Sequence, residues 1–296
     1  FLTSARDNNN VGNKSQTFVI DFALENLFDN YTYFVKRLGS RNLSNKYNRP
    51  KLEIKLKDKK IENVNYDTKK RFLDKIELMD ASFCTTDPKS LNINKKHKIY
   101  YLPNPVDDSF ETLKNYQNKF FNNDVFFAMS HGVHRGILKK GKFDERENFI
   151  NKLIKFTPDV RFDLYGMNGI QPIWADNYLY AISQSKIGLN LSQGKAAKYY
   201  SSDRFSQLIG NGLLVMIDEK TKIGNFFNKD EIVLYNSISD LSEKIIKYSN
   251  DNKLRSLIAK KGRDKYFKYF NSTIIADFII NKTFETNKNF YWEKVS

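Results

Sequence analysis

Four polar or glycine-rich segments, each directly after an apolar run, carry the side chains that could do chemistry. The first, residues 130–136, holds two histidines, an arginine and two glycines. Such a set can contact phosphate or sugar oxygens while the backbone approaches a ligand closely. Two histidines three apart without a third ligand argue against a metal site, and a surface imidazole is the alternative interpretation of each. The candidate residues of this segment are His131, Gly132 and Arg135.

The other three segments follow the same pattern. Residues 166–169 form a turn that could line a base or sugar pocket, residues 190–198 are polar and basic, and residues 201–204 open a predicted helix with Ser-Ser-Asp-Arg. The amides and positive dipole of a helix N-terminus attract anions, and with bases nearby we expect a phosphate. The alternative is ordinary capping by a serine beside solvated bases. The candidate binding residues here are Gly166, Asn168, Asn190, Lys198, Ser201, Ser202 and Arg204.

Several other chemistries lack their motifs. The sequence has no Gly-x-x-x-x-Gly-Lys-Ser/Thr phosphate loop, no Gly-x-Gly-x-x-Gly after a predicted strand and no Gly-x-Ser-x-Gly elbow. These absences argue against P-loop ATP hydrolysis, classical dinucleotide binding and serine hydrolysis. The one cysteine, Cys84, can form neither an internal disulfide nor a cysteine-based zinc site, which favours a reducing cytoplasm. In a predicted apolar strand we expect it to be a small buried residue.

Strands that alternate with helices position these segments from residue 124 onward. Apolar runs predict strands at 124–129, 160–165, 187–192, 213–218 and 231–235, and helical spacing predicts helices at 145–156, 174–186, 201–212, 239–249, 253–269 and 272–285. This order predicts a parallel sheet covered on both faces, hence a Rossmann-like domain. Ligands of such sheets bind beyond the carboxyl ends of the strands, where the four segments lie.

The first part of the chain indicates a second, smaller domain. Strand-like runs occur at 17–22 and 81–87, and prolines end another at 98–102, so we place the domains at 1–105 and 106–296. Asp21, at the end of the first of these runs, could face the cleft as a catalytic base, and His131 is the other candidate. A carboxylate at a strand end is also a common turn residue.

Composition limits the class of protein. The 296 residues are 40% hydrophobic and 15% aromatic, enough for a packed core, which rules out a disordered chain. No uncharged apolar run approaches the ~18 residues of a membrane-spanning helix, so we expect a soluble protein. The net charge of +15 is spread along the chain, as compositional bias would produce, rather than gathered into a nucleic-acid footprint.

The chain from about residue 124 to its closing helices resembles the nucleotide-sugar-binding half of group 1 glycosyl transferases, in the form found in spore-maturation-type glycosyltransferases. The resemblance is carried by KIGLNLSQG, SSDRFSQLIGNGLLVMIDE, FFNKDEIVLYNSISDLSEKI and LRSLIAKKGRDKY, in that order and spacing. It implies a GT-B fold, in which two Rossmann-like domains with parallel sheets face a cleft. The C-terminal domain would hold the donor and the N-terminal one the acceptor. It also implies no bound metal, because helix amides and basic side chains neutralise the leaving diphosphate.

Two positions depart from the pattern of the family. Gln207 stands where many members use a glutamate for the ribose, and Tyr199 stands where another glutamate faces the sugar. Gln207 can still accept a hydrogen bond through its carbonyl oxygen, so we retain it in the predicted donor site. The first domain is short and the chain starts at Phe1, so we expect missing N-terminal sequence or a reduced domain.

The predicted function is a metal-independent, cofactor-free glycosyltransferase that moves a sugar from a nucleotide-sugar donor to a glycan, lipid-linked or protein acceptor. We expect it in the cytoplasm, with peripheral contact of lysines at 95–98 and 139–142 at the inner face of the membrane as an additional hypothesis. One alternative is a non-catalytic nucleotide-sugar or glycan-binding protein, favoured by the missing acidic pair and the short first domain. Nucleic-acid binding is the least favoured alternative, since it rests only on the charge.

Overall fold

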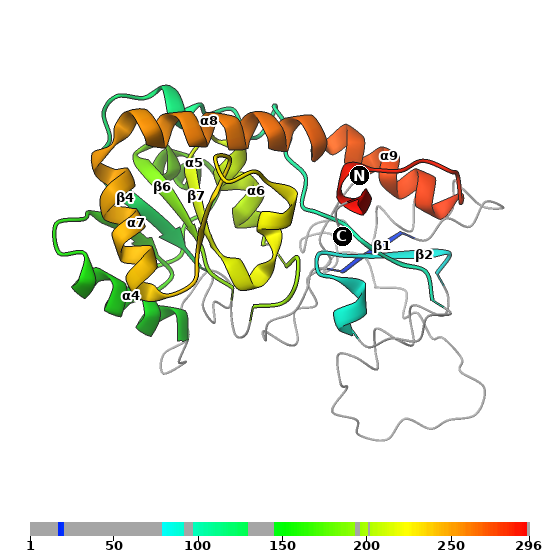
Figure 1. Ribbon diagram of the computed structural model, residues 1–296, viewed down its shortest axis with the longest axis horizontal. Coiled ribbons are helices and arrows are strands. Elements are labelled where there is room, and N and C mark those ends of the chain that lie inside the picture. Colours follow the sequence, from blue (N-terminus) through cyan, green and yellow to red (C-terminus); the bar gives the residue numbers. More distant parts are fainter. Residues whose placement is uncertain are drawn as a thin grey trace, which may run out of the picture.

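A computed structural model describes residues 17–20, 79–91, 97–129, 145–192, 196–200 and 202–294 (Figure 1). A three-stranded sheet has the order β1 (Thr17–Ile20), β2 (Ala81–Cys84) and β3 (Ile99–Tyr101). The predicted strands of the first domain are therefore present. β2 and β3 are parallel, whereas β1 runs antiparallel to β2, so the described part of this sheet is mixed. A short apolar run predicts a strand but carries no information on its direction.

The second sheet has five parallel strands in the order β5-β4-β6-β7-β8. This confirms the predicted Rossmann-like sheet. The strand bounds are β4 (Asn123–Ala128), β5 (Phe162–Tyr165), β6 (Ser185–Asn190), β7 (Leu214–Asp218) and β8 (Val233–Tyr235). The chain runs outward from β4 to β5 and then returns to the other side of β4, which makes the β4–β6 boundary the topological switch point of the sheet.

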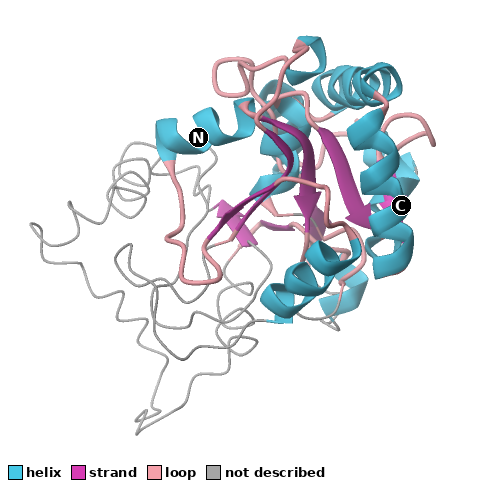
Figure 2. Cartoon of the chain, turned by 90° about the vertical axis from the view of Figure 1, so that its left-hand side faces the viewer, coloured by secondary structure: helices cyan, strands magenta, loops and turns pink. Residues whose placement is uncertain are grey.

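Helices cover both faces of this sheet (Figure 2). The helix bounds are α4 (Glu145–Phe156), α5 (Ala175–Ser183), α6 (Asp203–Gly210), α7 (Ile238–Asn250), α8 (Asn252–Tyr269) and α9 (Ser272–Thr283). Successive strand residues point to opposite faces, so Phe126 packs in the cluster with α5 and α6, and Phe127 in the cluster with α4 and α7. Short 3-10 helices lie at Pro88–Leu91, Asn115–Gln117, Glu219–Thr221, Ile223–Phe226 and Tyr291–Lys294.

The last helix packs on the first sheet rather than on the second. α8 runs along the second sheet, and α9 continues over β2 (Figure 1). The Phe278 ring lies 5.8 Å from the Phe83 ring and 6.3 Å from the Tyr100 ring between centroids. α9 thus packs on strands β2 and β3. The domain boundary near residue 105 stays a prediction.

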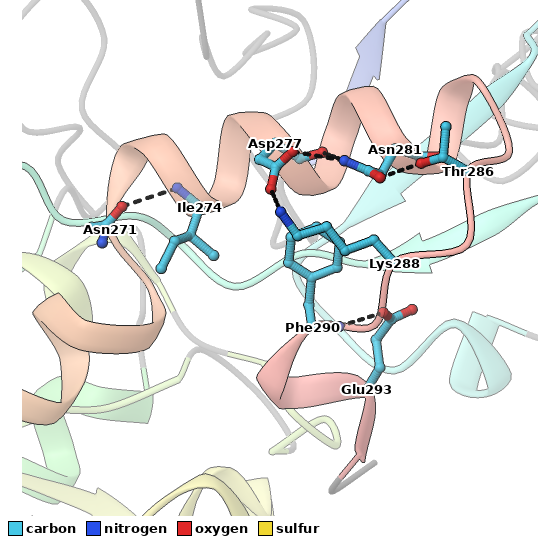
Figure 3. Close-up of polar contacts among 8 residues, drawn as sticks. All are labelled: Asn271, Ile274, Asp277, Asn281, Thr286, Lys288, Phe290 and Glu293. Carbon is cyan, nitrogen blue, oxygen red and sulfur yellow. Dashed lines mark hydrogen bonds and ion pairs between the residues drawn. The ribbon is translucent and has the colours of Figure 1, made fainter.

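The tail after α9 folds back along that helix (Figure 3). Lys288 pairs with Asp277, and the Phe290 amide donates to Glu293 at 3.0 Å. At the other end of α9, the Asn271 side chain caps the helix by accepting a hydrogen bond of 2.9 Å from the Ile274 amide. These contacts keep the buried rings of Phe290 and Trp292 beneath the helix.

In the described part of the chain, two segments that run from one sheet to the other are hydrogen-bonded to each other. The Val106 amide donates to the Phe270 carbonyl at 3.1 Å, and the Ser272 amide donates to the Val106 carbonyl at 2.9 Å. The Tyr266 hydroxyl adds a 2.6 Å bond to the carbonyl of Asn104. The linker and the turn between α8 and α9 therefore cross between the sheets side by side.

Cys84 is fully buried in β2, as its sequence context predicted. Burial raises the pKa of its thiol to about 12, and the thiol donates to the Thr86 carbonyl at 3.1 Å. Since the thiolate is the reactive form, we expect no labelling of native protein by a disulfide reagent at pH 8, and full labelling in denaturant. Absorbance of the released thiol checks this, and rapid labelling of the native protein would contradict it.

Candidate functional site

The candidate site lies at the carboxyl ends of β4 and β6, the switch point where parallel sheets bind ligands. Five predicted site residues lie outside the described part of the chain, and their roles stay predictions. They are Asp21, His131, Gly132, Arg135 and Ser201. The remaining seven can be placed.

Arg204 reaches across the switch point. It belongs to α6, on one face of the sheet, yet its guanidinium lies 4.9 Å from the ring centroid of Phe127, which belongs to the opposite face. One of its N–H groups donates to the Leu191 carbonyl, just after β6, at 3.2 Å. The guanidinium therefore lies over the carboxyl edge between β4 and β6.

Within the described ranges Arg204 forms no ion pair, although the carboxylate of Asp203 beside it attracts the guanidinium at longer range. The Arg204 side chain is partly buried, and burial lowers the pKa of its guanidinium to about 10. The guanidinium therefore remains charged at neutral pH. A partly buried cation without an ion-pair partner costs free energy, and a bound anion would recover part of that cost.

Asn190 ends β6, Ser202 lies two residues before Arg204, and these two side chains contact each other. The Ser202 hydroxyl donates to the Asn190 side-chain oxygen at 3.0 Å, so it makes no capping bond although Ser202 is the N-cap residue of α6. The structure therefore does not support the alternative in which the Ser202 side chain caps α6. The acidic side chain of Asp203 lies in the first turn of α6 and meets part of the helix dipole.

Lys198 points to the first sheet. Its ammonium lies 2.8 Å from the Asp87 carboxylate, and its carbonyl accepts bonds from the Asp87 amide at 2.9 Å and the Thr86 hydroxyl at 2.9 Å. The loop at 196–200 is thereby attached to the turn after β2. A phosphate-binding role for Lys198 stays a prediction, and it would require the ammonium to leave Asp87.

The Asp87–Lys198 pair predicts a pH dependence of stability. Burial alone would raise the pKa of Asp87, but hydrogen bonds from Lys198 and the Lys89 amide outweigh it, and the pKa falls below its ordinary 3.8. A lowered pKa stabilises the fold above pH 3.8, and this contribution is lost as the pH falls through the folded value. We expect a coupling free energy of about 1 kcal/mol at pH 7, limited by solvent screening.

A double-mutant cycle of Asp87→Asn and Lys198→Met, read by urea unfolding, measures this coupling at pH 7 and again at pH 3. The surface pair Asp230–Lys261 gives a matched control cycle. A coupling that is zero at pH 7, or unchanged at pH 3, would contradict the assigned role of the pair.

Gly166 and Asn168 hold the end of β5. Gly166 has φ of 77°, and a Cβ there would lie 1.6 Å from the Met129 carbonyl oxygen, so only glycine fits. The side chain of Asn168 exchanges two hydrogen bonds with Asn151 of α4, at 3.0 and 2.8 Å, and its amide donates to Glu147. These contacts give a structural reason for glycine at position 166 and asparagine at position 168. Binding roles for both residues stay predictions.

Gln207 lies one turn after Arg204 on α6 and is partly exposed. The backbone carbonyl of Gln207 accepts hydrogen bonds from the Asn211 amide and side chain at 3.1 and 2.8 Å.

The structure brings the predicted residues Asn190, Ser202 and Arg204 together, whereas Lys198 is paired with Asp87. Phe127 and Asp87 were missed from the sequence. The adjacent phenylalanines at 126 and 127 indicate that one ring faces each side of the sheet, but nothing local indicates the partner of Asp87.

Metal binding and membrane contact gain no support from the described residues. Within those ranges no three His, Cys, Asp or Glu side chains gather as a metal site requires, and no helix is long and apolar enough to cross a membrane. Of the lysine clusters, residues 95–96 and 139–142 lie outside the described ranges, and Lys98 pairs with Glu285. Metal independence and peripheral membrane contact stay predictions.

Comparison with known proteins places this site in a family context. A family model described as glycosyl transferase-like matches residues 145–281, and no curated protein matches the sequence. HepE from Anabaena, solved with UDP and glucose, is 11% identical with a TM-score of 0.53 over 74% of this chain and 68% of that one.

A second similar structure is a mutant TarM from S. aureus, solved with fondaparinux, alpha-GlcNAc-glycerol and UDP. It is 12% identical with a TM-score of 0.52 over 74% of this chain, which covers 48% of the TarM chain. This chain therefore spans about half the length of TarM. At identities this low, the similarity of the structures establishes the fold alone. The finer resemblance to spore-maturation-type enzymes stays a prediction. Residues 145–281 thus match a glycosyl transferase-like family model, and the chain shares the GT-B fold of these solved structures.

Proposed function

We propose that this protein transfers a sugar from a nucleotide-sugar donor to a glycan, lipid-linked or protein acceptor, with the donor diphosphate beside Arg204. The observation that carries the proposal is a guanidinium at the switch point that forms no ion pair among the described residues. The HepE and TarM structures, both solved in complex with UDP, support the choice of ligand.

The chemistry follows from where charge develops. Breaking the bond between sugar and phosphate builds negative charge on the leaving oxygen, and fixed donors that already point there stabilise it. Arg204 would supply the positive charge, and the first amides of α6, which Ser202 leaves uncapped, would supply further donors. Arg135 and Gly132 are predicted to join them, and His131 or Asp21 is the predicted base. No metal is needed in this scheme.

One observation favours the non-catalytic alternative. Tyr199, which stands where related enzymes have a glutamate facing the sugar, is 3% exposed and has φ of 60°. Its ring packs 5.5 Å from Tyr101 and 4.8 Å from Phe226 between centroids. It is therefore a core residue, and this position brings no acidic group to a sugar. A nucleotide-sugar-binding protein on the same scaffold would need none.

Two measurements on the full chain separate these functions. Calorimetric titration with UDP, GDP, ADP and CMP tests binding, and chromatography of released nucleotide after incubation with the corresponding sugar conjugates tests turnover. Both are done with EDTA and with magnesium. We expect one nucleotide to bind without metal and its sugar conjugate to be slowly hydrolysed. Binding without release supports the non-catalytic alternative, and no binding by folded protein contradicts both.

A further inference from the structure

An open pocket lies on the flank of the second sheet, at the carboxyl end of the edge strand β5. Its volume is about 410 Å³, within the usual range of small-molecule sites, and it is lined by Tyr165 of β5, residues 170–173, and Asn177 and Tyr180 of α5. None of these residues belongs to the group of Asn190, Ser202 and Arg204. Since β5 is the edge strand, with β4 between it and β6, the pocket is also separated from the switch point by a strand.

Aromatic and apolar groups on the walls of this pocket are left in contact with water. Tyr180 is 67% exposed and Ile170 is 45% exposed, and Trp174, in the same connecting segment, is 50% exposed. Tyr165 lies deeper, with its ring 6.0 Å from that of Phe126 between centroids, so its position is fixed by the core. The fixed ring of Tyr165 and the exposed ring of Tyr180 form a surface on which a flat ligand with an apolar face can stack.

The polar groups of the pocket are amides and hydroxyls. Asn177 and Gln171 are exposed, and each offers donors and an acceptor to a ligand. Asp163 lies two residues before Tyr165 on the same face of β5, and its carboxylate interacts with the Tyr165 hydroxyl. Burial, with Asp163 nearby, raises the pKa of Tyr165 to about 12, so the hydroxyl keeps its proton.

The chemistry of the lining selects against anions. None of the lining residues is charged, and the nearby Asp163 would repel a phosphate or carboxylate. A pyranose ring matches the remaining features, because one of its faces carries C–H groups that stack on tyrosine, and its hydroxyls exchange hydrogen bonds with amides and a carboxylate.

We propose that this pocket binds one ring of a neutral saccharide. The proposal goes beyond the proposed function, because the pocket would hold a glycan whether or not the chain transfers a sugar. Tyr180 and Tyr165 stack on the ring, Asn177 and Gln171 contact its hydroxyls, and Asp163 orients the Tyr165 hydroxyl.

Saturation-transfer NMR on the full chain tests the proposal, with methyl glycosides of glucose, galactose and N-acetylglucosamine and with maltose as probes. We expect saturation of ring C–H protons by at least one probe. We also expect about tenfold weaker binding in each of Tyr180→Ala and Asn177→Ala, and nearly unchanged binding in Tyr180→Phe, which keeps the ring. Both alanine variants change exposed side chains, so we expect them to fold, which circular dichroism checks.

Two controls distinguish this site from the rest of the molecule. Phe156→Ala removes an exposed aromatic side chain of α4, 55% exposed, and should leave saccharide binding unchanged. Arg204→Ala should leave it unchanged as well. No saturation of any probe in the wild type overturns the proposal. Loss of nucleotide binding in Tyr180→Ala also overturns it, because the pocket would then hold the base of a nucleotide.

Discussion

Replacing Arg204 by alanine will weaken the binding of whichever nucleotide the wild type binds by about 100-fold, with only a small change in melting temperature. The expected binding loss is large because the guanidinium would meet the proposed diphosphate in a partly buried place, without an ion-pair partner in the described part of the chain. The stability change is small because the variant loses the Phe127 contact and the Leu191 bond but also loses the cost of burying a cation. Titration calorimetry and thermal unfolding measure the two quantities.

Two further variants make this prediction specific. Arg204→Lys keeps the charge but not the planar fork of donors, so we expect intermediate binding. Arg161→Ala removes an exposed arginine that pairs with Asp124 at the amino end of β4, far from the switch point along the strand, and should leave binding unchanged. Wild-type affinity in Arg204→Ala would show that the anion site is elsewhere.

Replacing Gly166 by alanine will destabilise the protein by about 4 kcal/mol or prevent folding. The new Cβ would meet the Met129 carbonyl oxygen at 1.6 Å, and the backbone would hold a side chain at φ of 77°. The oxygen cannot retreat easily, because the Met129 amide is itself bonded to the Tyr165 carbonyl at 3.0 Å. Urea unfolding monitored by circular dichroism measures the loss.

Gly169→Ala is the matched control. Gly169 also has φ of 77°, yet a Cβ there meets nothing within 4 Å. Its replacement therefore isolates the backbone strain, for which we expect about 1 to 2 kcal/mol. Equal losses in the two variants would show that the contact with Met129 is not what requires glycine at position 166.

The core of the second sheet could be predicted because its strands are buried on both faces. The apolar runs at 187–192 and 213–218 overlap β6 and β7, and glycine or helix signals bound each of them. The junction between α5 and β6 could not be predicted from the sequence. The predicted helix ran to residue 186, whereas α5 ends at Ser183 and β6 starts at Ser185. Pairing of Asn123 with Ser185 fixes that start, and this tertiary contact has no local signal.

The candidate site likewise has a part that the sequence predicts and a part that it does not. Asn190, Ser202 and Arg204 each follow a strand end or open a helix, and a parallel sheet brings such positions to one edge whatever its other details. The contact between Lys198 and Asp87 joins residues 111 apart in the chain. It depends on how the two sheets pack, as does the placement of α9 over β2, and no periodicity in the sequence encodes either.

The paired crossings of the chain between the sheets limit how the domains can move. Because Val106 is hydrogen-bonded to Phe270 and Ser272, the linker and the α8–α9 turn are coupled and do not move as two independent connections. Any rotation of the first sheet against the second must bend both of these passages together, and it must also act on the bonds that hold the 196–200 loop to the turn after β2. The two sheets are therefore joined at two separate places, and a change in their relative position has to break hydrogen bonds at one of them.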